Sequence, residues 1–432
     1  MPPATGRAPS ATLPLSYLVA AATAFVLTAL ALPWLAEALA GHYYQPRVFA
    51  LTHTLTLGWI TLSIMGASYQ LIPILLERPI WSERLARAQF VVLVTGIVGM
   101  VGHFFIAEWP GLLWGAGLVA LGVAAHVANA VMSVRGLPQA SFTGRLVVLA
   151  LAGLVLTTVF GAVLGLDHVI KILPGSVLAN VHAHIHLALL GFVLPMVIGV
   201  AARVYPLFLL VREPAGWLGA LQLWGLAGGM PLVVAGILVD ARPVLVAGAL
   251  AVAGAIGGHV AWVVGMVQGR KRPALDWGLR LVLTGTAFLV AATAMGLGFA
   301  FGVLAGPRYG LAYGILALGG WASLTIAGMM LKIVPFLVWY LAYAPRVGRQ
   351  LVPTLAQLSW VPGERIAAAL LAGGVCALAS AVVAGEAAWI RVAGVLTATG
   401  ALALAATLAR VLHHLMPCAA RELTPAAGRQ PS

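Results

Sequence analysis

The stretch from His182 to Leu210, HAHIHLALLGFVLPMVIGVAARVYPLFLL, decides how the rest of the chain is interpreted. It opens with three histidines in five residues and continues as a largely apolar segment, with Gly191, Gly199 and Pro206 spaced along it. Ionisable side chains are rare in long apolar segments unless they have a function. The stretch therefore predicts a transmembrane helix with a functional group of imidazoles near its start.

The same frame of two glycines and a proline occurs twice more. In each copy the second glycine follows the first by eight residues, and the proline follows by seven more. The other copies are HTLTLGWITLSIMGASYQLIPILL (53–76), with Gly58, Gly66 and Pro73, and YGILALGGWASLTIAGMMLKIVPFLVW (313–339), with Gly320, Gly328 and Pro335. Three copies of one spacing pattern predict an internal repeat.

The composition excludes a water-soluble protein. The 432 residues are 62% hydrophobic and 8% charged, and the mean hydropathy is +1.03. Such values are typical of a polytopic membrane protein. The net charge of +13 comes from basic residues scattered between apolar runs, as in positive-inside loops, so we expect no nucleic-acid binding. Cys376 and Cys418 have no pairing or metal-ligand spacing.

Apolar runs of about 20 residues, the length that crosses a bilayer core, predict twelve spans. We expect them at 14–38, 48–76, 88–107, 110–133, 144–165, 180–210, 216–239, 242–268, 276–304, 310–341, 364–386 and 388–415. The first could be mistaken for a signal peptide, but removing it would leave the first repeat one helix short.

The twelve spans divide into three sets of four, with the Gly–Gly–Pro span second in each set. The predicted fold is therefore an all-α membrane domain around a pseudo-threefold axis, with repeats at 14–138, 144–273 and 276–417. Residues 418–432 form a polar tail that we expect to be disordered. Lys and Arg are more frequent in the termini and even-numbered loops, which predicts cytoplasmic termini and places the His182 cluster in the outer half of the bilayer.

The three clustered histidines point in two directions. At about 100° per residue, His182 and His186 share one face of a helix and His184 points to the opposite face. One helix thus offers imidazoles to two clefts, and we interpret them as ligands of a metal or a heme. The alternative is a polar group that lines a water-filled cavity or stabilises a helix crossing.

The pair H-x-H at His184 and His186, followed by a glycine-rich run and Pro206, resembles the heme-bearing helix of heme–copper oxidase and nitric oxide reductase catalytic subunits (subunit I). That family has twelve helices in three sets of four, and its H-x-H pair serves two hemes on opposite sides of one helix. The resemblance covers the whole chain in topology, and the second and sixth spans in motif. It implies one or two hemes, expected to be of b type, and electron transfer or handling of oxygen or nitric oxide. It also implies a cytochrome c-like or quinol electron donor, a diatomic gas as ligand, and a bacterial or archaeal cytoplasmic membrane.

The sequence departs from the family at the copper site. The family takes an adjacent His–His pair from its seventh helix, but the span 216–239 contains no histidine, so the resemblance does not support copper. No expected span carries a carboxylate in its interior, so we expect no proton route through a buried acid and no proton-pumping oxygen reduction. Whether the chain is an oxidase-like or nitric-oxide-reductase-like enzyme stays open.

The repeat suggests how the ligands pair. His53 and His186 each stand twenty residues before the proline of their copy, and His184 and Tyr313 each stand twenty-two before it. Equivalent positions around a threefold arrangement face successive clefts. Each cleft therefore takes one residue that stands twenty positions before the proline of its copy, and one from the neighbouring copy that stands twenty-two positions before it. We therefore predict a bis-His heme between the second and sixth spans, held by His53 and His184.

The other clefts differ. Between the sixth and tenth spans, His186, with or without His182, could hold a five-coordinate heme beside Tyr313, which would donate a hydrogen bond or ligate the iron. The alternative is that Tyr313 is an interfacial aromatic residue. The third cleft presents Leu51 and Ile315 and should hold no ligand.

Several other polar residues have predicted roles outside iron ligation. Arg47, with Lys171 and Arg308, lies where cations could pair with heme propionates. Gln70, Arg203 and Lys332 share one repeat position and are expected to contact lipid phosphate or helix ends. We expect packing roles for His126 and His259, a solvated His103, and no specific partner for His413 and His414.

Two further classes of function remain open beside a heme protein. One is a small-molecule or metal transporter with a histidine-lined path, and the other is a structural or assembly subunit without cofactors.

Overall fold

The computed structural model describes residues 10–76, 79–135, 141–211, 216–271 and 274–416, without the side chains of residues 72–76. Within these ranges the chain is helical, has no β-strand and contains twelve helices long and apolar enough to cross a membrane. The twelve predicted spans are thus confirmed. The predicted repeat ends at Pro138 and Pro273 and the polar tail lie outside the described residues.

Nine spans are single α-helices and three are compound. The single ones are α1 (Thr12–Ala31), α5 (Glu83–Phe105), α6 (Trp109–Val134), α7 (Phe142–Ile170), α10 (Gly216–Leu238), α11 (Arg242–Gln268), α12 (Trp277–Ala300), α16 (Val361–Ala384) and α17 (Ala387–Leu412). The compound ones are α3 (Pro46–His53) with η1 (Thr54–Thr61) and α4 (Leu62–Leu76), α8 (Val177–His186) with η2 (Leu187–Val193) and α9 (Leu194–Leu209), and α13 (Pro307–Gly314) with η3 (Ile315–Ala322) and α14 (Ser323–Ala342). Short helices are α2 (Ala36–Ala40), α15 (Leu355–Leu358), η4 (Ala344–Arg346) and η5 (His413–Leu415). We call the compound spans the inner spans.

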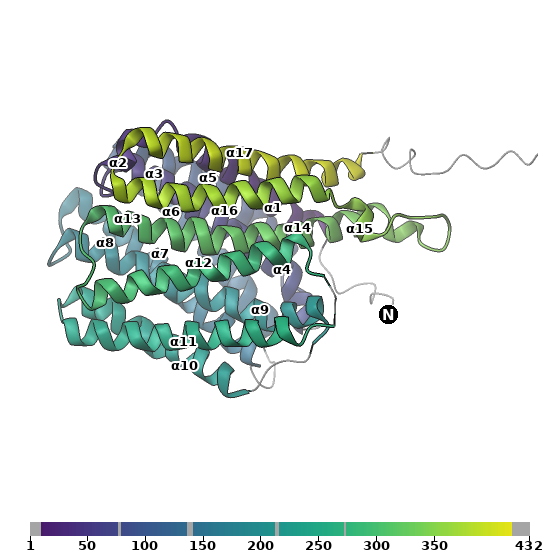
Figure 1. Cartoon of the computed structure of the whole chain (residues 1–432), viewed down its shortest axis with the longest axis horizontal. Helices are drawn as coiled ribbons and strands as arrows, with labels where there is room; N and C mark the ends of the chain where they lie inside the picture. Colours follow the sequence, from purple (N-terminus) through teal and green to yellow (C-terminus); the bar gives the residue numbers. More distant parts are fainter. Residues whose placement is uncertain (1–9, 77–78, 136–140, 212–215, 272–273, 417–432) are drawn as a thin grey trace, which may run out of the picture.

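The helices close into a ring. Each inner span packs against the first helix of its own set, α4 on α1, α9 on α7 and α14 on α12. The sets are joined by α6 with α7, α11 with α12, and α17 with α1. In Figure 1, α3, α8 and α13 lie at one end of the bundle and α4 and α9 at the other, so the inner spans run in the same direction. This is the predicted arrangement of three sets of four.

The repeated glycines explain how closely the inner spans approach their neighbours. A Cβ added at Gly66 would lie 2.5 Å from the Cβ of Tyr17 on α1, and one at Gly199 would lie 3.0 Å from the Cβ of Leu146 on α7. One at Gly328 would meet the backbone carbonyl of Gly278 on α12. Small residues let helices in lipid pack by close van der Waals contact, which accounts for glycine at these positions.

Each inner span contains a π-helical segment that the sequence pattern did not predict. The segments η1, η2 and η3 begin directly after His53, His186 and Gly314, which are at nearly the same repeat position. Short π-helical insertions in α-helices are frequent at functional sites. A π turn holds more residues than an α turn. It therefore rotates the helix face that carries the histidines, before the π-helical segment, relative to the face that carries the glycines, after it. The imidazoles can therefore face the space between the inner spans, while the glycines contact the surrounding helices.

Candidate functional site

A cavity of about 790 Å³ lies between the inner spans at the end that carries α3, α8 and α13. This volume lies within the range of cofactor and ligand pockets. Apolar side chains dominate its lining, and none of the described lining residues is Lys, Arg, Asp or Glu. The lining histidines are His42, His53, His168, His182, His184 and His186.

His53 ends α3 and has one ring nitrogen committed to the backbone. Its Nδ1 donates to the carbonyl oxygen of Phe49 at 2.8 Å, and its ring stacks on Phe104 with the centroids 4.7 Å apart. The hydrogen-bonded Nδ1–H leaves the lone pair on Nε2, for which the described residues offer no hydrogen-bond partner. Imidazoles that ligate metals typically have this arrangement, since a carbonyl fixes the tautomer and the ring direction.

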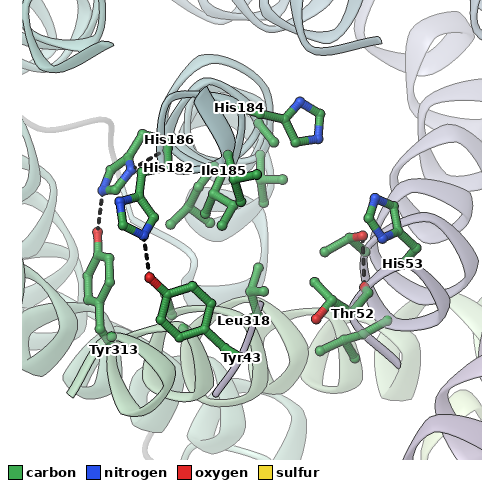
Figure 2. A pocket seen from close by; sticks show the side chains of 18 of the residues that line it. Tyr43, Thr52, His53, His182, His184, Ile185, His186, Tyr313 and Leu318 are labelled. Carbon is green, nitrogen blue, oxygen red and sulfur yellow. Dashed lines mark hydrogen bonds between the residues drawn. The ribbon is translucent and has the colours of Figure 1, made fainter. Parts of the chain in front are cut away.

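His184 projects from α8 to the side on which His53 lies (Figure 2). Its Nδ1 is buried and has no hydrogen-bond partner among the described residues, which costs about 1–3 kcal/mol for a buried polar group. Its ring lies against Gly161 of α7, where an added Cβ would be 2.8 Å from the ring Cε1. The predicted pair His53 and His184 therefore lines one side of the same cavity.

His182 and His186 project to the other side of α8, toward Tyr43 and Tyr313 (Figure 2). The Nδ1 of His186 donates to the carbonyl oxygen of His182 at 2.8 Å, and its Nε2 lies 3.5 Å from the hydroxyl of Tyr313. The His186 and Tyr313 rings are nearly parallel, with centroids 5.9 Å apart. Both predicted residues of the second cleft thus lie within reach of each other, and Tyr313 is turned toward His186.

The hydroxyl of Tyr43, in the loop before α3, lies 2.6 Å from the Nε2 of His182. Burial raises the pKa of Tyr43 above its usual value of 10.0, so the phenol keeps its proton at neutral pH and forms a hydrogen bond with this nitrogen of His182. His182 is therefore less available as an iron ligand than His53, His184 or His186.

Between the second and tenth spans, the described residues at the two predicted ligand positions are Leu51 and Ile315, neither of which has an imidazole. Leu51 of α3 and Ile315 of η3 pack against one apolar cluster, which includes Leu378 and Val382 of α16. The segments η1 and η3 also contact each other directly. Leu51 and Ile315 also line the cavity, so apolar side chains stand at the position where the sequence predicts no ligand.

Two other histidines near this end have a close polar contact at each ring nitrogen. His168 bonds the carbonyl oxygen of Leu164 at 3.0 Å and the hydroxyl of Tyr44 at 3.1 Å. His103, expected to be solvated, instead accepts a hydrogen bond from Trp114 Nε1 at 2.9 Å and contacts Glu108 at 2.8 Å. Neither has a lone pair left for a metal.

The histidines of the fourth spans lie away from the cavity. His126 is buried, packs edge-on against Tyr69 and has an Nδ1 without a described partner. His259 lies 3.3 Å from the amide oxygen of Gln222. These contacts agree with the packing roles expected for both. His414, expected to lack a specific partner, bonds the Tyr343 hydroxyl at 2.8 Å.

Arg47 is not among the residues that line the cavity. Its guanidinium carbon lies 5.9 Å from the ring centroid of Phe105, the last residue of α5. Arg308 behaves similarly, because it donates to the carbonyl oxygen of Ala384 at the end of α16. Cations at helix C-termini interact favourably with the helix dipole, so both arginines have a structural role in addition to any role toward propionates.

Lys332 forms an ion pair with Asp276, whose side chain caps the N-terminus of α12 by accepting from the backbone N–H of Leu279 at 3.0 Å. The helix-end interaction expected at this repeat position is thus present, and Arg203 at the equivalent position also has an interaction partner. The third equivalent residue, Gln70, is buried, and its amide oxygen has no described partner.

The two buried carboxylates that the structure describes lie in the end turns of their spans and not in the span interiors. The helix α7 continues to Ile170 and includes the buried Asp167, which accepts from the backbone N–H groups of Ile172 and Leu173, each at 2.7 Å. The buried Glu364 lies in the first turn of α16, which begins at Val361. Neither acid lines the cavity.

The sequence pattern missed Tyr43 and Gly161. The tyrosine lies in the polar stretch HYYQPR (42–47) directly before the second span, so its position gave a usable signal. The glycine had none, because it is one of 50 and belongs to no repeated frame. Among the described residues, no group of three or more His, Cys, Asp or Glu side chains could hold a metal ion.

Comparison with known proteins identifies the fold. No protein-family model and no curated protein matches the chain. Among solved structures, the chain is similar to one from the cryo-EM structure of a heme–copper terminal oxidase dimer, with a TM-score of 0.70 and 13% sequence identity. The match covers 94% of this chain and 84% of that one. At this identity the likeness concerns the fold alone: the twelve-span chain shares the fold of that heme–copper terminal oxidase chain.

Proposed function

We propose that this chain is a heme-binding integral membrane protein related to respiratory oxidase subunit I. Its role would be electron transfer or the handling of oxygen or nitric oxide. The observation that carries the proposal is the His53–His184 side of the cavity, where imidazoles from two inner spans face a space lined mainly by apolar side chains. The heme–copper oxidase fold supports it independently.

His53 and His184 would hold the iron of a low-spin, bis-His heme. His53 is oriented for this role by its bond to Phe49, and the contact of His184 with Gly161 leaves that ring room at the cavity wall. When bound, the heme supplies one-electron redox chemistry. The apolar walls exclude water and give a low local dielectric, which affects the redox potential.

His186 would hold the second heme on the other side of α8. Its bond to the His182 carbonyl orients the ring, and the Tyr313 hydroxyl lies close enough to the Nε2 to interact with a small molecule there. The hydrogen bond with Tyr43 holds His182 in place beside this site. We propose that this second site takes a diatomic gas, with electrons from a cytochrome c-like or quinol donor.

The test is a visible spectrum of the protein purified from cells supplied with heme precursor, oxidised and reduced, together with a metal analysis. The proposal predicts Soret and α bands and iron in a ratio of one or two per chain. A colourless, folded protein without iron would contradict it and favour a structural or assembly subunit. Stoichiometric zinc or copper without heme would also contradict it and favour a transporter with a histidine-lined path.

The matched pair of variants is His53→Ala and His103→Gln. Both residues lie at the same end of the bundle, but only His53 has a ring nitrogen available to the cavity. The low-spin bands should disappear in His53→Ala and remain in His103→Gln.

A further inference from the structure

The two predicted ligands of the first heme are held very differently. The imidazoles of His53, His168 and His186 each bond through Nδ1 to the carbonyl oxygen four residues earlier, at 2.8, 3.0 and 2.8 Å. His184 does not make the equivalent bond to Asn180, and its Nδ1 is buried without a described partner. In the first site, the ring of His53 is thus oriented by a backbone hydrogen bond and the ring of His184 is not.

The ring of His184 instead lies in a recess on α7. The glycine at position 161 forms the recess, since an added Cβ there would lie 2.8 Å from Cε1 and 3.5 Å from both nitrogens of His184. These three ring atoms of His184 are the nearest heavy atoms to that Cβ position apart from the backbone of α7 itself. Phe160 flanks the recess edge-on, with its ring centroid 6.3 Å from that of His184.

A metal-ligating imidazole normally donates its other N–H to a carbonyl or carboxylate, and loss of that partner typically weakens metal binding 10–100-fold. The missing partner therefore makes His184 the weaker ligand of the pair. The recess offers this ring a packed position, which would lower the cost of its dissociation from a bound heme iron.

We propose that His184 is an exchangeable ligand, that the Gly161 recess holds its ring when it is dissociated, and that a small neutral ligand such as carbon monoxide or nitric oxide takes its place while His53 stays bound. In this exchange His184 withdraws its Nε2 lone pair and the incoming molecule supplies one, so no electron or proton is transferred. This inference rests on the proposed heme at His53 and His184. It adds a second gas site, on the opposite side of α8 from His186.

The experiment measures carbon monoxide binding to the reduced, purified protein by stopped-flow spectroscopy. His186→Leu is the background in which every variant is made, so that only the His53–His184 side is observed. The binding rate should level off with rising carbon monoxide concentration, because dissociation of His184 becomes limiting. In His184→Ala the rate should instead rise linearly, with no plateau.

The sharper variant is Gly161→Ala, whose added methyl group fills the recess. Moving the His184 ring into the filled recess should cost about as much as a typical overpacking substitution, so the plateau rate should fall about tenfold. Gly165→Ala is its matched control, since it lies one turn further along α7, also lines the cavity, and would place its Cβ in ordinary contact at 3.7 and 3.8 Å with Leu112 and Leu113. Its plateau rate should equal that of the background.

The outcomes separate this inference from the proposed function. A protein without heme bands contradicts the proposed function itself. A bis-His heme that binds no carbon monoxide, a plateau that survives in His184→Ala, or equal rates for Gly161→Ala and Gly165→Ala would each overturn the exchangeable ligand while leaving the heme site in place.

Discussion

The two sides of the sixth span make an instructive contrast. On one side, His184 has a buried Nδ1 without a described partner and lies on the side of His53. Its ring lies against Gly161 of α7. On the other, His186 and His182 are bonded to the backbone and to tyrosines. Residues two positions apart on one helix thus serve two different environments, an apolar side with two imidazoles and a polar side with hydroxyl groups.

The largest expected effect is on the apolar side. His53→Ala removes the better-oriented ligand, so the low-spin heme signal should be abolished while gas binding on the His186 side persists. Absorption and heme content of the purified variant measure both. Equal loss of both signals would mean that the sides do not act as separate sites.

The reciprocal change is His186→Ala. The ligand held by the His182 carbonyl is lost, so gas binding on the tyrosine side should be abolished and the low-spin signal retained. Carbon monoxide difference spectra of the reduced variant measure this. Retention of the tyrosine-side gas signal would exclude His186 as its ligand.

The apolar side depends on close packing of α7 against η2. An added Cβ at Gly153 would collide with the backbone of Gly191, so Gly153→Ala should destabilise the fold by about 1–3 kcal/mol. Thermal unfolding in detergent compares it with Gly117→Ala, where nothing lies within 4 Å and a change within about 0.5 kcal/mol is expected. Equal melting of the two variants would contradict the packing argument.

The tyrosine side should respond more mildly to loss of one hydroxyl. Tyr313→Phe removes a group 3.5 Å from the Nε2 of His186, and one neutral hydrogen bond contributes about 0.5–1.5 kcal/mol. We expect the bound gas to dissociate about fivefold faster on this side, with no change on the other. An unchanged rate would assign Tyr313 to the helix interface, the alternative that the sequence left open.

The smallest effect concerns pH. Because burial raises the pKa of Tyr43 above 10.0, the unfolded chain loses this proton first as pH rises, and the folded state loses stability from about pH 10 up to the folded pKa. Tyr43→Phe should remove that contribution. Wild type and variant should therefore lose different amounts of stability between pH 9 and 11, a range on the order of one unit on either side of the ordinary tyrosine pKa. Parallel loss would mean that Tyr43 is not buried as described.

The fold could be predicted from the sequence because its determinants repeat. Gly66, Gly199 and Gly328 mark the same contact three times, and apolar runs of span length leave little alternative in a bilayer. The helix period also placed His184 opposite His182 and His186, as Figure 2 shows.

The rest depended on information that no local pattern carries. The π-helical segments have no sequence signal that we recognised. The helix α7 runs to Ile170, beyond the predicted end of its span, and the carboxylate of Asp167 in its last turn accepts from the backbone N–H groups of Ile172 and Leu173. The meeting of Gly161 with His184 and of Tyr43 with His182 is a contact between distant segments, so it became visible only in three dimensions.

The most direct test of the heme site is electron paramagnetic resonance of the oxidised, purified protein, recorded for wild type, His53→Ala, His184→Ala and His186→Ala. The account predicts a low-spin ferric signal in wild type and in His186→Ala that is lost in the other two. A low-spin signal of full intensity in either His53→Ala or His184→Ala would contradict it.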